Sequence, residues 1–145
     1  MAVASSASPV LVSTWSFARI GHEQAWPGLM AGGSALDAAV ATCTAVEADP
    51  SVDSVGYGGL PDASGAVTLD ACVMLDPARS GSVTGVRRHL EVTALARCVM
   101  ERTPHLMLTG DGADAFAAEQ GFAARELVSP ESAARYEAWT RDGRT

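Results

Sequence analysis

The most informative absence is lysine. All 10 basic residues are arginines, and the 145 residues carry a net charge of −7. A phosphate-binding glycine-lysine loop and lysine-based covalent catalysis are therefore excluded. The acidic balance also argues against a nucleic-acid partner, because phosphate recognition needs a basic stripe on the protein surface.

Cysteine is scarce and unpaired. Cys43, Cys72 and Cys98 are far apart and odd in number. Zinc sites need paired ligands at short spacing, which this sequence lacks, so we expect no metal and no other cofactor. Each cysteine stands in an apolar context, which predicts three buried free thiols in a reducing compartment.

Long apolar runs are also missing. No stretch approaches the roughly 20 residues of a membrane span, so no membrane partner is expected. Residues 1–9 lack a basic segment and a long apolar core, and we interpret them as a flexible tail rather than a signal peptide. A cytoplasmic location is the expectation, with a periplasmic one left open.

What is present favours one folded domain. Hydrophobic residues make up 48% of the chain, and a chain of this length buries a core of its own. Periodicity and turn residues predict a layered α/β or α+β domain. The expected strands cover residues 9–15, 66–75, 81–86 and 106–109, and the expected helices cover 22–31, 34–48, 91–102, 111–121 and 130–138. Ser34 and Asp37 resemble a capping box, and Ser129 precedes a proline at the first helical position.

Most catalytic constellations cannot be assigned. His22, His89 and His105 have no ligand spacing, and surface or hydrogen-bonded structural roles are expected for them. Asp111 and Asp114 are too few for a calcium loop, so helix capping is the better interpretation. No Ser-His-Asp or Cys-His arrangement follows from spacing alone.

Two local features stand out. Ser13-Thr-Trp15 ends the first predicted strand, where functional groups often lie, although tryptophan there is commonly a core or rim residue. Ser54-Val-Gly-Tyr-Gly-Gly59 combines a hydroxyl with three glycines, which allow a backbone to approach a ligand or another chain closely. A plain tight turn is the simpler interpretation of that loop.

Taken in order, several segments resemble the N-terminal part of the glycosylasparaginases (aspartylglucosaminidases). The resemblance covers about residues 10–140. No single segment identifies the family, but the ordered set of segments is specific to it. The matching segments are Val12-Ser-Thr-Trp-Ser-Phe17, Glu23-Gln-Ala-Trp26, Gly32-Gly-Ser-Ala-Leu-Asp-Ala38, Asp53-Ser-Val-Gly-Tyr-Gly-Gly59, Pro61-Asp62, Val67-Thr-Leu-Asp-Ala-Cys72, Gly81-Ser-Val83, Ala96-Arg-Cys-Val-Met-Glu-Arg-Thr-Pro-His105, Met107-Leu-Thr-Gly-Asp-Gly-Ala113, Gln120-Gly-Phe122 and Glu131-Ser132.

The resemblance implies an N-terminal nucleophile (Ntn) hydrolase. Its fold would be α+β, a four-layer αββα sandwich of which residues 10–140 form only the α-subunit part. In this family a precursor cleaves itself before a threonine. The new N-terminal threonine of the β chain attacks the amide between N-acetylglucosamine and asparagine, with its own amine as base. Residues 141–145 would begin the linker to that β chain, and an (αβ)2 heterotetramer is expected.

The resemblance places no catalytic residue in this chain, because the sequence stops before the family's His-Asp-Thr cleavage motif. Trp15 matches a tryptophan that lines the active site, and Ser54 matches a serine near the nucleophile. Phe17 is a weaker candidate at the rim. Leu60 and the segment 87–90 depart from the family pattern and leave the substrate preference in doubt.

Two other interpretations stay open. One is an asparaginase or isoaspartyl peptidase of the same superfamily, for which asparagine without sugar would suffice. The other is an orphan domain without catalysis, acting as a binding or interaction module. This last interpretation predicts a soluble monomer, whereas an α chain without its partner should expose sheet edges and apolar surface.

Overall fold

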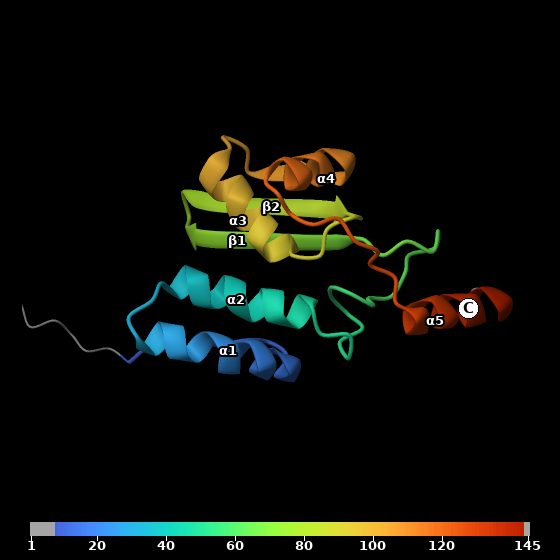
Figure 1. Cartoon of the computed structure of the whole chain (residues 1–145), viewed down its shortest axis with the longest axis horizontal. Helices are drawn as coiled ribbons and strands as arrows, with labels where there is room; N and C mark the ends of the chain where they lie inside the picture. Colours follow the sequence, from blue (N-terminus) through green and yellow to red (C-terminus); the bar gives the residue numbers. More distant parts are fainter. Residues whose placement is uncertain (1–7, 144–145) are drawn as a thin grey trace, which may run out of the picture.

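The computed structural model describes residues 8–143. A three-stranded sheet carries helices on one face, with a helical pair beside it and a last helix at one end (Figure 1). The elements are η1 (Ser16–Ala18), α1 (Arg19–Met30), α2 (Ala35–Glu47), β1 (Leu69–Asp76), β2 (Arg79–Val86), α3 (Val92–Arg102), β3 (Met107–Thr109), α4 (Gly110–Glu119) and α5 (Pro130–Arg141). The predicted α+β class is thereby confirmed for these residues.

The sheet begins with the predicted hairpin. β1 and β2 pair antiparallel across a two-residue connection, in which the Asp76 carboxylate accepts a hydrogen bond from the N–H of Ala78 at 2.9 Å. β3 then pairs with β2 in parallel, after the α3 crossover. The strand order is β1-β2-β3, so β1 lies at one edge of this sheet.

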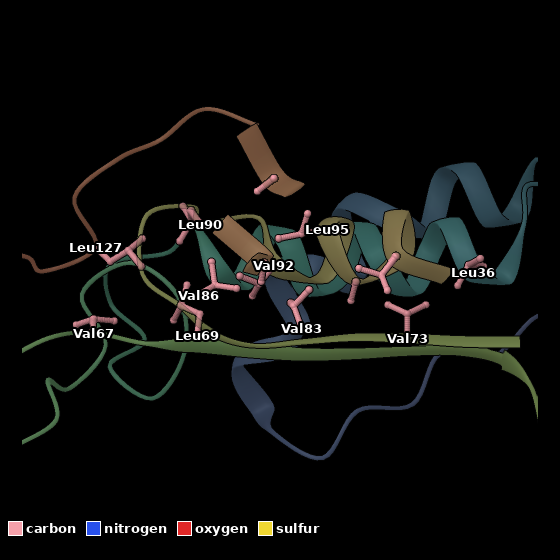
Figure 2. Packing of buried hydrophobic residues seen from close by; sticks show 14 residues of the cluster. Leu36, Val67, Leu69, Val73, Val83, Val86, Leu90, Val92, Leu95 and Leu127 are labelled. Atoms are coloured by element: carbon pink, nitrogen blue, oxygen red, sulfur yellow. The ribbon is translucent and has the colours of Figure 1, made fainter. Parts of the chain in front are cut away.

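One face of the sheet, which we call the covered face, is packed against α3 and α4. Its side chains are Leu69, Val73, Val83 and Val86, and each is buried. They meet the fully buried Leu95 of α3, and Figure 2 shows the labelled core side chains on one side of the strands. The helix predicted over residues 91–102 is therefore confirmed, and its buried side chains face the sheet.

The opposite face, which we call the open face, carries Asp70, Cys72 and Met74 of β1. All three are exposed, and the Met74 side chain is 63% exposed. Cys72 and Met74 stand opposite Ser82 and Ser80 of β2. Antiparallel sheets often solvate one face, but that face is then uniformly polar. Here it mixes apolar and polar side chains.

The helical pair α1 and α2 forms as the turn residues predict. Gly32 adopts a positive φ of 86° just after α1. The Ser34 side chain then caps α2 by accepting from the N–H groups of Leu36 and Asp37. The Asp37 carboxylate does not complete a capping box, because it pairs with Arg97 of α3 at 2.6 Å.

The C-terminal part also follows its local signals. Ser129 and Ser132 form a reciprocal capping box at α5, with Pro130 at its first position. α5 continues to Arg141, further than the sequence predicted. α4 starts at Gly110, so Asp111 lies inside its first turn rather than at its cap, and Asp114 is buried and bonded to His89. The capping roles expected for these two aspartates are therefore wrong.

Three further expectations are corrected. The strand predicted at residues 9–15 is absent: Val10 and Val12 are 74% and 87% exposed, and no described strand lies beside them to form a ladder. α1 starts at Arg19 rather than at His22. Cys43 and Cys72 are exposed and Cys98 is half-buried, because Cys43 borders a pocket and Cys72 stands on the open face.

The predictions for the two ends of the chain concern mostly residues that the structure does not describe. Residues 1–7 of the predicted tail and residues 144–145 of the predicted linker lie outside the described residues. Within residues 8–143, no helix combines the length and apolar character that crossing a membrane requires.

Candidate functional site

A cavity lies where the N-terminal segment, α2, the 51–61 loop and β1 meet. Its volume is about 510 Å³. Trp15, Phe17 and Ser54, the three site residues predicted from the family resemblance, all line it. They come from segments about 40 residues apart, which the fold brings together. Their roles at this site stay predictions.

Trp15 and Phe17 form an aromatic wall. Their rings stack with centroids 6.0 Å apart and an interplanar angle of 8°. Trp15 is 67% exposed, so most of its surface has no cover within residues 8–143. η1 positions the pair, because this single turn joins the N-terminal segment to α1 and packs on α2. A flat apolar wall of this kind binds a planar or ring-shaped group without titrating.

Ser54 is presented by a firmly anchored loop. The N–H of Tyr57 donates to the Glu47 carbonyl at 2.8 Å, and the N–H of Gly58 donates to the Leu127 carbonyl at 2.9 Å. An ion pair between Asp53 and Arg135 ties the loop to α5. The loop is therefore held by α2, by the chain before α5 and by α5 itself.

The glycine at position 56 is required by this packing. Its φ is +66°, and a Cβ built there would lie 2.0 Å from the Glu47 carbonyl oxygen. No side chain fits at that distance, and positive φ already disfavours other residues. The glycine-rich sequence thus brings the Ser54 loop against the end of α2. This approach is to α2 of the same chain, so approach to a ligand or to another chain stays a prediction.

Glu47 and Thr93 form a buried polar pair in the pocket wall. Glu47 is 5% exposed, and its Oε1 accepts from the Thr93 N–H at 3.0 Å and from the Thr93 hydroxyl at 2.5 Å. Its Oε2 is buried and has no hydrogen-bond partner among the described residues. Burial raises the pKa of Glu47 above its ordinary value, although the Thr93 bonds oppose the shift.

Cys43 borders the same pocket one helical turn before Glu47. Although Cys43 is exposed as a residue, partial burial of its thiol raises its pKa, and the nearby Glu47 charge adds to the shift. A raised pKa makes a thiol a poor nucleophile at neutral pH. Cys43 is therefore not a candidate for covalent catalysis.

One hydroxyl of the pocket has an imidazole partner. Ser13 Oγ lies 2.8 Å from His22 Nε2. Among residues 8–143, no carboxylate forms a hydrogen bond or ion pair with His22 to orient its ring. A serine nucleophile needs a base oriented in this way. The pair instead ties the N-terminal segment to α1.

The remaining candidates lie elsewhere. The His89 and Asp114 side chains form a buried pair at 2.8 Å between the end of β2 and α4. Neither residue lines the pocket, and neither do Leu60 and residues 87–90, which depart from the family pattern. Among residues 8–143, no three metal-ligating side chains gather in one place.

Sequence reasoning missed Glu47. Its signal was a charge on an apolar helix stripe, since Leu36, Val40, Cys43 and Glu47 recur at spacings of four, three and four residues. A carboxylate at a helix C-terminus is also opposed by the helix dipole. Both features are unfavourable for the helix itself, which indicates that Glu47 has a role other than stabilising α2.

Comparison with known proteins identifies the family. A profile of the Asparaginase family matches residues 3–144, almost the whole chain. This chain belongs to the Asparaginase family. The resemblance inferred from the ordered segments is thereby confirmed, and the pocket lined by Trp15 and Ser54 becomes the first place to seek the family's chemistry.

Three relatives of this chain from different organisms have the same name. The chain is 45% identical to an N(4)-(beta-N-acetylglucosaminyl)-L-asparaginase of Elizabethkingia miricola over 133 residues, which are 92% of this chain and 39% of that protein. Proteins of the same name from Rattus norvegicus and Mus musculus are 41% and 40% identical over 132 and 136 residues, covering 90% and 93% of this chain and 38% and 39% of theirs. The chain thus spans about two fifths of the length of these relatives.

Proposed function

We propose that this chain is the α portion of an N4-(β-N-acetylglucosaminyl)-L-asparaginase. The reaction is hydrolysis of the amide between N-acetylglucosamine and the asparagine side chain, giving L-aspartate and the amino sugar. The observation that carries the proposal is the pocket itself. It has an aromatic wall and an anchored serine, but among the described residues no nucleophile paired with an oriented base.

The missing chemistry would come from further polypeptide. We infer a β chain that begins with a threonine released by self-cleavage, whose hydroxyl attacks the amide carbonyl while its α-amine takes the proton. An α-amine suits this role because its pKa lies near neutrality. Ser54 would orient this threonine, and Trp15 with Phe17 would form the opposite wall against the substrate.

The arrangement of the sheet supports completion by a second layer. The covered face already has its helices, whereas the open face and Trp15 carry exposed apolar groups. In a four-layer αββα sandwich, each sheet has helices on one face and the other sheet on its second face. The open face therefore has the place of the inner layer, and an (αβ)2 assembly would follow once that layer is filled.

A substrate panel tests the proposal. The protein translated from the whole open reading frame should hydrolyse GlcNAc-asparagine, and residues 1–145 alone should hydrolyse nothing. Free asparagine and a β-aspartyl dipeptide distinguish the alternative of an asparaginase or isoaspartyl peptidase. If the reading frame contains no further polypeptide, or if its product cleaves none of the three amides, the enzyme proposal is wrong and the orphan-domain alternative takes its place.

Trp15 offers the sharpest variant within this chain. Trp15→Ala should lower kcat/KM for GlcNAc-asparagine by about tenfold or more, the loss expected for one well-packed aromatic contact. In residues 1–145 alone its effect on stability should be small, because Trp15 is 67% exposed there. Trp26→Ala is the matched control, since Trp26 is 41% exposed on α1 and does not line the pocket. Equal kinetics for the two variants would remove Trp15 from the site.

A further inference from the structure

The two carboxylate oxygens of Glu47 have different surroundings. Oε1 accepts both hydrogen bonds from Thr93, at the start of α3. This is a long-range helix cap, because Glu91 at the N-cap position makes no side-chain bond to the helix. The first N–H groups of a helix need acceptors, so Oε1 has a structural role.

Oε2 makes no hydrogen bond to the described residues, although the Val92 N–H lies near enough to the carboxylate to lower its pKa. It is buried without a partner, and leaving a buried acceptor unpaired is unfavourable. The hydroxyl of Thr42, five residues earlier on α2, is also buried and unpaired. Both residues line the pocket shared by Trp15 and Ser54. These two unsatisfied polar atoms in one pocket wall can accept hydrogen bonds from a water or from a group inserted into the pocket.

The charge of the pocket indicates what kind of donor this is. Its titratable lining groups are Cys43, Glu47, Asp70 and Cys72, with Glu91 near the Glu47 carboxylate. Within residues 8–143, no arginine or histidine lines it. Two carboxylates without a cation favour a nitrogen donor that can carry positive charge. Asp70 already accepts from the Thr84 hydroxyl and the Gly85 N–H, so Glu47 is the unsatisfied carboxylate.

We propose that Glu47 is a positioning residue whose Oε2 accepts a hydrogen bond from an amino group inserted into this pocket, and that this bond places the amine beside Ser54. The inference rests on the proposed function, which supplies two amines. One is the N-terminal amine of the completing chain, and the other is the α-amine of the asparagine substrate.

The backbone of Glu47 explains how the bond would place the amine. The Glu47 carbonyl accepts the Tyr57 N–H, and Gly56 packs directly on it. The same residue thus holds the Ser54 loop through its backbone and the amine through its side chain. Any movement of Glu47 changes the distance between the Ser54 loop and the amine. The placement of the nucleophile depends on this distance.

The kinetic test uses the protein from the whole reading frame with Glu47→Gln. The variant keeps an oxygen to accept from Thr93 but turns an NH2 donor toward the amine. We expect its kcat/KM for GlcNAc-asparagine to fall by about tenfold or more, as for loss of one charge-assisted bond. The acid limb of its pH profile should also shift. Thr93→Val removes only the hydroxyl bond to Oε1. Because that bond lowers the pKa of Glu47, this variant should be less stable and its acid limb should move to higher pH.

A substrate lacking the α-amine separates the two sources. If the amine bonded to Glu47 belongs to the completing chain, Glu47→Gln impairs turnover of GlcNAc-asparagine and of its analogue without the α-amine, and it slows self-cleavage. If that amine belongs to the substrate, the variant raises KM only for the substrate with the amine. The inference would be overturned if Glu47→Gln kept kcat/KM within twofold of the wild type for both substrates and an unchanged acid limb. The proposed function would then still stand.

A second readout needs no catalysis. With glutamate labelled at the side-chain carboxyl carbon, the Glu47 signal is assigned by its loss in Glu47→Gln and titrated by carbon-13 NMR. In residues 1–145 alone it should titrate above the ordinary glutamate pKa of 4.5. In the completed protein an amine bonded to Oε2 should lower that pKa. An equal or higher pKa in the completed protein would overturn the inference even if no amide is hydrolysed.

Discussion

The two faces of the sheet differ in completeness. On the covered face, Val83, Val86 and Leu95 are at most 1% exposed, and α3 and α4 fill the space above the strands. On the open face, Met74 is 63% exposed, and beside it the pocket holds Trp15 at 67% and an unpaired Glu47 oxygen. The first region has the close packing of a folded core, with the buried His89 Nε2 at its margin left unpaired. The second region combines exposed apolar side chains with an unpaired buried carboxylate oxygen.

This contrast separates a region that stabilises the fold from a region that another group can complete. Interiors that are closed and paired contribute stability, whereas unpaired buried polar atoms and exposed aromatic walls mark surfaces that another group completes. Among the described residues, the unpaired oxygens of Thr42 and Glu47 line the same pocket as the exposed Trp15, whereas Thr44 Oγ1 and His89 Nε2 are unpaired outside it. We therefore assign stability to the covered face, and our proposed function puts the substrate at the pocket.

The largest expected effect is on the covered face. Leu95→Ala should lower the free energy of unfolding by about 2–5 kcal/mol, because a fully buried leucine loses its transfer free energy and leaves a cavity. Met74→Ala on the open face should cost less than about 1 kcal/mol in residues 1–145. Urea unfolding of both variants measures the contrast, and equal costs would break the distinction between the faces.

A smaller loss is expected where the two regions meet. Gly56→Ala forces a Cβ to within 2.0 Å of the Glu47 carbonyl at a positive φ, and should cost about 2–3 kcal/mol. Gly112→Ala is the control: it lies in α4 with open space around its Cβ position and should be neutral or stabilising by up to about 1 kcal/mol. Thermal unfolding of both compares them. A Gly56→Ala variant as stable as the wild type would show that the loop is not held as described.

The smallest effects are opposite pH dependences of two buried carboxylates. Burial opposes ionisation of Asp114, but hydrogen bonds from His89 and from the Arg87 and Arg88 N–H groups outweigh it and hold its pKa below 3.8. Its stabilisation is complete above that ordinary value and is lost as the pH falls through the lowered pKa. Glu47 has a raised pKa, so its contribution is largest below 4.5 and is lost as the pH rises through the raised value.

Unfolding curves at several pH values check both signs. The stability of the wild type relative to Asp114→Asn should decline in acid below pH 3.8. Its stability relative to Glu47→Gln, measured on residues 1–145, should instead improve as the pH is lowered toward 4.5. Two differences with the same sign would mean that one of the two carboxylates is not in the environment described.

The covered region was largely predictable from local signals. The β1–β2 hairpin follows from an apolar run and an Asp-Pro turn, and α3 follows from its buried stripe. Ser34 and Ser129 mark helix starts by their capping chemistry. These features depend on neighbours within a few residues, which a sequence displays directly.

The rest depends on contacts that spacing does not reveal. Residues 9–15 have strand character, but a strand forms only beside a partner, and no described strand supplies one. Cys43 lies on an apolar stripe yet borders a pocket. Glu47 and Thr93 meet across 46 residues, and His89 meets Asp114 across 25. The resemblance to the family brought Trp15 and Ser54 to attention, while the fold alone brought Glu47.

Hydrogen exchange compares the two regions directly. Backbone amides should be measured in residues 1–145 and in the protein from the whole reading frame. We predict a large gain of protection in the completed protein at residues 10–18 and along β1, with little change in α3. Equal exchange at residues 10–18 and β1 in both proteins would contradict the claim that further polypeptide completes the open face and the Trp15 pocket.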